Sequence, residues 1–184
     1  PAASNFAGSG TTYTFDVVQG SSDGTVSVSV AAGAATDAAG NDNTVSNTYT
    51  LTIDSTASTV TITSSSGSSG DTVTSTTLSY TVTFSESVTG FVVGDITVTG
   101  TANSDSPAAS NFAGSGTTYT FDVVQGSSIG TVLVSVAAGV ATDAAGNENT
   151  ASNTYTLTII LRTAPCSRLV ILGNCGTIAI NNDE

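Results

Sequence analysis

Apolar and polar residues alternate along most of the chain in short segments that are separated by clusters of Ser, Gly, Asn and Asp. Alternation with a period of two indicates β-strands that bury one face, and the clusters are typical of turns. No segment has the apolar period of a helix. The pattern therefore predicts an all-β fold in which antiparallel strands pack as a β-sandwich. The alternating segments between residues 55 and 160 are 59–63, 78–84, 95–99, 118–123, 131–136 and 153–159.

The inward phase of these segments predicts the core of a seven-stranded sandwich over residues 55–160. The residues expected inside are Val60, Ile62, Tyr80, Val82, Phe84, Ile96, Val98, Tyr119, Phe121, Val132, Val134, Val136, Tyr155 and Leu157.

An internal repeat sets the domain organisation. Residues 1–53 and 107–159 align without a gap at an offset of 106 and differ at five positions. A unit of this length matches a sandwich domain better than a solenoid repeat. We expect residues 55–160 to be one complete unit, 1–54 to be the second half of a preceding unit, and 161–184 to be a divergent tail. The tail starts like another unit, because residues 162–165 resemble residues 55–58.

Two of the five differences are expected on the outer face of one strand. In the first copy these positions hold Asp23 and Ser27, which we expect to be solvated, whereas the second copy has Ile129 and Leu133. Ile160 likewise stands where the first copy has an aspartate. The outer surface of the second copy is thus more apolar. Neutral drift would explain this, because isolated exposed aliphatic residues are common, whereas two of them on one face suggest that something covers it.

The charge balance excludes several classes of function. The net charge is −12, the chain has no histidine, and its two arginines both lie beyond residue 161. A chain without a basic patch cannot neutralise nucleic-acid phosphates or bind an anionic membrane surface. No apolar stretch reaches the roughly 18–20 residues of a membrane helix. A serine nucleophile would have neither histidine nor lysine as its base, and the carboxylates recur in repeated loops, so we expect no enzymatic activity.

Three runs carry a resemblance to a known family. TVTFSESVTGF (81–91), GDITVTG (94–100) and ATDAAGN (141–147) resemble, in this order, the bacterial Ig-like repeats of large secreted or surface-anchored adhesins. The resemblance covers residues 1–160 and leaves out the tail. It implies an Ig-like sandwich and an extracellular location, with neighbouring repeats as partners and a load-bearing or spacing role.

Three functions fit this picture. The favoured one is a non-catalytic module of a stalk or fibre of a bacterial surface adhesin. A carbohydrate-binding or receptor-binding module should carry an aromatic loop, yet only Phe91 and Phe112 depart from the strand phase. A filament subunit, completed by β-strand donation between copies of the chain, would use the tail as a partial donor for residues 1–54.

Two acidic loops are candidates for metal binding. The first copy offers Asp37, Asn41 and Asp42, and the second offers Asp143, Asn147 and Glu148. Asp, Asn and Gly also form ordinary turns, so each loop has a purely structural interpretation. The alternative is Ca²⁺, which binds six to eight oxygens from carboxylates and carbonyls.

Ig connectivity would bring one of these loops to the linker between the units. The second strand and the last hairpin of the complete unit would both turn at its N-terminal pole. Glu86, Asp95 and the loop 143–149 would then lie near Asp54, and no cation in the sequence before residue 162 would relieve their repulsion. A junctional calcium ion and plain turns both remain open.

The only cysteines, Cys166 and Cys175, lie in the tail. An exported chain favours a disulfide over free thiols, and the bond would close a short hairpin around Gly173 and Asn174.

Overall fold

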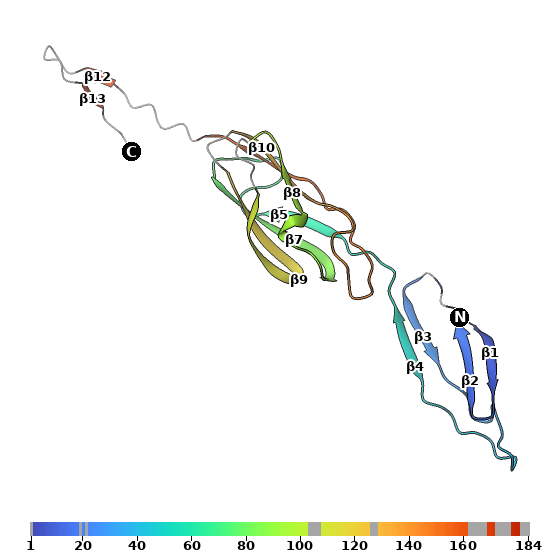
Figure 1. Cartoon of the computed structure of the whole chain (residues 1–184). Helices are drawn as coiled ribbons and strands as arrows, with labels where there is room; N and C mark the ends of the chain where they lie inside the picture. The colour runs from blue at the N-terminus through green and yellow to red at the C-terminus, as the bar shows by residue number, and fades with distance from the viewer. Residues whose placement is uncertain are drawn as a thin grey trace.

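The structure is a computed structural model that describes residues 2–18, 20, 22–102, 108–125 and 129–161, and the backbone of 169–171 and 178–180. Strands β1 to β4 form two separate pairs, and strands β5 to β11 form a closed sandwich on the other side of the linker, residues 54–59 (Figure 1). None of the described residues belongs to a helix long and apolar enough to cross a membrane.

Residues 60–159 form a sandwich of two sheets with seven strands among the described residues. The first sheet has the order β5-β7-β9, and its strands are β5 (Val60–Ser64), β7 (Thr77–Val88) and β9 (Ala109–Val124). The second has the order β6-β11-β10-β8, with β6 (Thr72–Val73), β11 (Tyr155–Ile159), β10 (Gly130–Val136) and β8 (Ile96–Thr99). A short 3₁₀ helix, η1 (Val93–Asp95), precedes β8. All pairs are antiparallel except β6 with β11, so the predicted Ig-like sandwich is confirmed with one short parallel edge.

The core lies between these two sheets. Every residue predicted inside is buried except Val98, which packs against the core while partly exposed. Phe91 and Phe112 join it from outside the strand phase: Phe91 is buried, and its ring lies 5.2 Å from that of Phe84 and 5.6 Å from that of Phe112. The two aromatics that a binding loop would present are therefore packing residues of the complete unit.

Residues 1–53 repeat the second half of this sandwich without its first half. The strands are β1 (Ala3–Ser9), β2 (Thr12–Val17), β3 (Gly24–Val28) and β4 (Tyr49–Ile53). β1 pairs with β2, and β3 pairs with β4 in the register of β10 with β11. We call this body the half-domain.

In the tail, β12 (Leu169–Ile171) pairs antiparallel with β13 (Ile178–Ile180), as expected for a hairpin. The predicted disulfide between Cys166 and Cys175 and the turn at Gly173 and Asn174 lie outside the described residues.

Candidate metal centre

The loop between β10 and β11 is a tight turn built around one buried carboxylate. Asp143 Oδ1 accepts the backbone N–H groups of Ala145 (2.8 Å) and Asn147 (2.9 Å), and its Oδ2 accepts the Asn147 side-chain amide at 2.9 Å. Asp37 makes the same three bonds in the first copy, to Ala39 and Asn41. The repeated sequence therefore folds into the same turn whether or not another unit lies beside it.

A backbone bridge holds this turn against the end of β7. Thr89 and Thr142 each donate their backbone N–H to the other's carbonyl, at 2.8 and 3.0 Å. Ser85 N–H also donates to Thr59 O at 2.9 Å, which brings the start of β5 to the same end. The last hairpin, β7 and the incoming linker thus meet at the N-terminal pole, as Ig connectivity predicts.

Three carboxylates converge at this pole. Asp54 from the linker, Glu86 from β7 and Asp143 from the loop each have a carboxylate oxygen within 4.8 Å of the other two. Asp54 is exposed, Glu86 half-buried and Asp143 buried. Asn147 ties the loop to the linker, because its side-chain amide also donates to the backbone carbonyl of Asp54 at 3.2 Å. We call Asp54, Glu86 and Asp143 the junction triad.

Two of the other predicted ligands lie outside the triad. Asp95 accepts the backbone N–H of Val92 at 2.8 Å and so closes the turn of η1. Glu148 directs its carboxylate toward Gly139 on the other arm of its own hairpin. A position near the junction does not determine where a side chain points. The carboxylates of Asp95 and Glu148 both lie against backbone groups of their own local turn.

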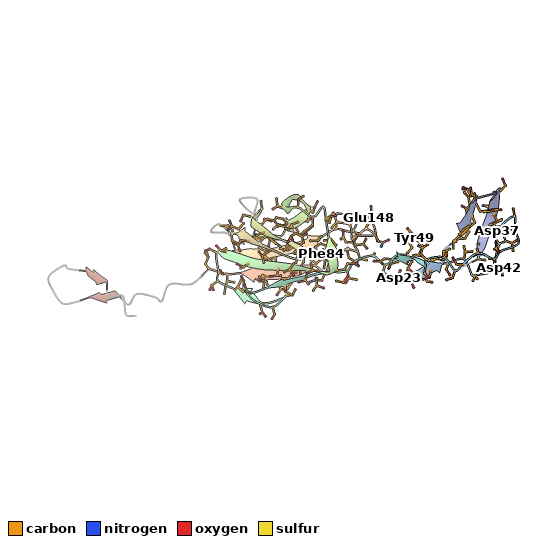
Figure 2. All side chains as sticks on the ribbon, turned by 90° about the horizontal axis from the view of Figure 1, so that it is seen from below. Asp23, Asp37, Asp42, Tyr49, Phe84 and Glu148 are labelled. Atoms are coloured by element: carbon orange, nitrogen blue, oxygen red, sulfur yellow. The ribbon has the colours of Figure 1, made fainter. Side chains whose placement is uncertain are left out.

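The first-copy residues lie at the far end of the half-domain. Figure 2 shows Asp37 and Asp42 at the end away from the sandwich, whereas Asp23 lies near the linker. Asp37, Asn41 and Asp42 form a loop without a third carboxylate in the triad arrangement, among the residues that the structure describes. Strand β4 lies between this loop and the linker, so Asp37, Asn41 and Asp42 are not part of the carboxylate cluster that contains Asp54.

Sequence reasoning missed one residue of the half-domain that contacts the linker, Asp23. We expected it to be merely solvated, but its Oδ1 accepts the backbone N–H and the hydroxyl of Ser55, both at 2.7 Å. Its Oδ2 accepts the hydroxyl of Thr56. A comparison of the repeats could have revealed this contact. At an offset of 106 residues, the positions of Asp23, Asp54 and Ser55 hold Ile129, Ile160 and Leu161. The residues of this contact change together.

The surroundings at the junction shift the pKa values of two of its carboxylic acids in opposite directions. Partial burial, together with the carboxylates of Asp143, Asp54 and Asp23, raises the pKa of Glu86 above its ordinary value. The amide of Asn147 and the loop N–H groups lower the pKa of Asp143. Glu86 is therefore the acid whose ionisation the folded junction disfavours.

We expect Glu86→Gln to raise the Tm of the chain at pH 7 in the presence of a chelator. A raised folded-state pKa means that ionised Glu86 destabilises the fold, and this destabilisation disappears as the pH falls below the ordinary value of 4.5. The gain should therefore shrink to nothing near pH 4, which thermal unfolding followed by circular dichroism will measure. Glu148→Gln, outside the triad, is the matched control. An equal gain from both variants would show that only net charge matters.

The oxygen set of the junction suits a hard divalent cation. Carboxylates and backbone carbonyls are the ligands that Ca²⁺ prefers, and zinc would call for histidine or cysteine. Each carboxylate has about four lone-pair positions. Asp143 uses three of these for hydrogen bonds and Asp54 Oδ1 uses one for Thr56 N–H, so each retains capacity for a cation. The linker, β7 and the loop together therefore present oxygen atoms of the kind that calcium prefers, in addition to the turn that the loop forms.

Comparison with known proteins identifies the complete unit. Residues 54–159 match the family model described as "Bacterial Ig-like domain". The matched range begins at Asp54 and ends with β11. Searches of the curated proteins and of the solved structures gave no significant match.

Proposed function

Because the chain belongs to the family of bacterial Ig-like domains, we propose that it is an extracellular structural module that sets the spacing within a stalk or fibre of a bacterial surface adhesin. Domains of this family are generally non-catalytic and often lie at the cell surface. The observation that carries the proposal is the two-sided hold on the linker. Asp23 of the half-domain binds Ser55 and Thr56, while Asn147 of the sandwich binds the carbonyl of Asp54.

This hold supports a mechanical role for the linker. A free linker of a few residues lets neighbouring domains reorient, because few contacts cross it. Here the sandwich binds Asp54, and the half-domain binds the next two residues, Ser55 and Thr56. Residues 54–56 therefore relate the two bodies through hydrogen bonds as well as through the chain.

A divalent cation at the junction would complete this role. Asp54, Glu86 and Asp143 would hold it, with Asp23 contributing negative charge nearby. Bound calcium would neutralise carboxylates that otherwise repel one another, and Asp54 would then join the linker to the sandwich through a further contact. Extracellular calcium-binding modules have Kd values of about 10⁻⁴–10⁻³ M, which suit the millimolar calcium concentration outside cells.

We expect calcium to stabilise and stiffen the full chain. At a Kd of about 1 mM, about 10 mM calcium should raise the Tm of the sandwich by about 5 °C or more. Small-angle scattering should show a narrower distribution of pair distances between the two bodies. Asp54→Ala combined with Asp143→Ala should abolish both effects.

Two further variants separate the cation from the turn. Asp143→Ala also removes a buried turn, whereas Asp54→Asn keeps an oxygen for Thr56 N–H and removes only the charge. Asp54→Asn should therefore weaken the calcium response without lowering the Tm in the absence of calcium, because it also relieves repulsion on Glu86. Asp37→Ala should leave the response intact. If titration calorimetry detects no binding at millimolar calcium, the loop has only the structural role of a turn.

A filament subunit completed by β-strand donation is the second candidate function. The observation in its favour is the half-domain, whose large side chains stay exposed: Tyr13, Phe15, Tyr49 and Leu51. Exposed sheet edges beside such a face favour pairing with another strand.

A further inference from the structure

The end of the sandwich from which β11 leads to the tail carries aliphatic residues on the outer face of the second sheet. Gly130 of β10 lies opposite Ile159 of β11, so Ile129 and Ile160 lie next to each other where this strand pair ends. Their side chains are 60% and 46% exposed, and that of the next residue, Leu161, is 58% exposed. A half-buried leucine follows on the same face, four residues along β10. We call this set the exit patch: Ile129, Leu133, Ile160 and Leu161.

The repeat distinguishes the exit patch from scattered drift. At the offset of 106 residues, the first copy carries polar residues at all four positions: Asp23, Ser27, Asp54 and Ser55. The remaining differences between the copies exchange one apolar residue for another, or one acid for another. Single exposed aliphatic residues are common on protein surfaces. Here every change from polar to aliphatic falls at one end of one sheet, which favours a surface that is covered.

The hairpin β12–β13 is an apolar element that follows the exit patch in the chain. Its strand residues read Leu-Val-Ile and Ile-Ala-Ile, without a polar residue in either strand. Within the part of the chain that the structure describes, the two strands pair only with each other. A lone two-stranded hairpin is at best marginally stable in water and needs an apolar surface to pack on. The hairpin therefore needs a surface of the kind that the exit patch presents.

The connection between the two surfaces is short. Residues 162–168 join the exit patch to β12, and seven residues span at most about 25 Å. The patch extends about 13 Å along β10 from Ile129 to Leu133, and a strand of three residues covers about 10 Å. The hairpin thus matches the patch in size and can reach all of it. A short tether also gives an effective concentration in the millimolar range, so a weak apolar contact is sufficient.

We propose that the hairpin β12–β13 packs on the exit patch of its own chain. Ile129 and Ile160 form the centre of the contact, with Leu133 and Leu161 on either side. At the other end of the sandwich, the half-domain holds the linker through the hydrogen bonds of Asp23. The sandwich is therefore joined to the preceding body by a polar contact and to the tail by an apolar one.

Trypsin provides the test, because the chain has no lysine and its two arginines, Arg162 and Arg168, lie between the patch and β12. Mass spectrometry of reduced digests of the full chain measures the rate of cleavage after each arginine. A docked hairpin protects the bond after Arg168, since cleavage then requires undocking. Ile129→Asp should therefore speed this cleavage about tenfold, and Ile160→Asp should have the same effect. The first copy carries aspartate at both positions in the same strand register, so both variants should keep the sandwich folded, which thermal unfolding checks.

Thr97→Asp is the matched control. Thr97 is exposed on the same outer face, opposite Ser135, which lies about 20 Å along β10 from Ile129. The control adds one negative charge, as Ile129→Asp does, and should leave the cleavage rate unchanged. Equal rates for these two variants would overturn the proposal. Protection that falls on dilution would also overturn it, because another copy of the chain would then cover the hairpin.

Discussion

Phe121→Ala should destabilise the sandwich by about 3–5 kcal/mol, which is the usual cost of truncating a buried aromatic residue. Phe121 is 1% exposed, lies opposite Tyr80 in the β7–β9 register, and stacks on that ring. Its removal leaves a cavity between the two sheets in addition to the lost burial. For a domain of about 100 residues this loss lowers the Tm by more than about 10 °C.

The repeat supplies a matched control for this substitution. Phe15 occupies the same local sequence in the half-domain but is 37% exposed. Phe15→Ala should leave the unfolding transition of the sandwich unchanged. Urea denaturation followed by circular dichroism measures both variants. A loss below about 1 kcal/mol for Phe121→Ala, or equal losses for the pair, would place the core elsewhere.

The alternation of residues was enough to predict the strands of the sandwich except β6, and most of its core, although Leu78, Val123 and Ile159 are buried in addition to the residues expected inside. Regular strands bury every second residue, so Tyr80, Val82 and Phe84 needed no further information. Phe91 and Phe112 could not be predicted in this way. Phe91 follows β7 just before η1, and Phe112 follows Asn111, whose φ is +52°. A positive φ or a turn shifts the phase, and the shift depends on tertiary packing.

At the junction, too, one part of the arrangement could be predicted from the sequence and another part could not. Connectivity alone brought Asp54, Glu86 and Asp143 together, because strand ends of an Ig-like sandwich must meet at one pole. Side-chain direction was beyond the sequence for Asp95 and Glu148, whose nearest backbone groups are local. Asp23 was missed because an exposed position was taken to mean a side chain in contact with water alone. An exposed carboxylate before a strand can still accept hydrogen bonds from the neighbouring linker.

Asn149 is the residue on which the loop of the junction depends. It is 2% exposed, and its Oδ1 accepts the backbone N–H groups of Val140 (2.9 Å) and Ala141 (2.8 Å). Its amide donates to the carbonyls of Ala137 (2.9 Å) and Thr150 (2.7 Å). One side chain therefore satisfies backbone groups on both arms of the hairpin that presents Asp143.

Asn149→Ala should cost about 3 kcal/mol or more, because each buried backbone group left without a partner costs about 1–3 kcal/mol. Asn43→Ala is the matched control. Asn43 makes the corresponding bonds to Ala31, Ala35 and Thr44 at the far end of the half-domain, so its loss should not move the sandwich transition. Denaturation measures the stability of both variants, and calorimetry measures the response to calcium. If the loop positions Asp143 for a cation, Asn149→Ala will weaken calcium binding even where the sandwich stays folded, whereas Asn43→Ala will not. A loss below about 1 kcal/mol with unchanged calcium binding would show that the backbone bridge between Thr89 and Thr142 holds the loop without Asn149.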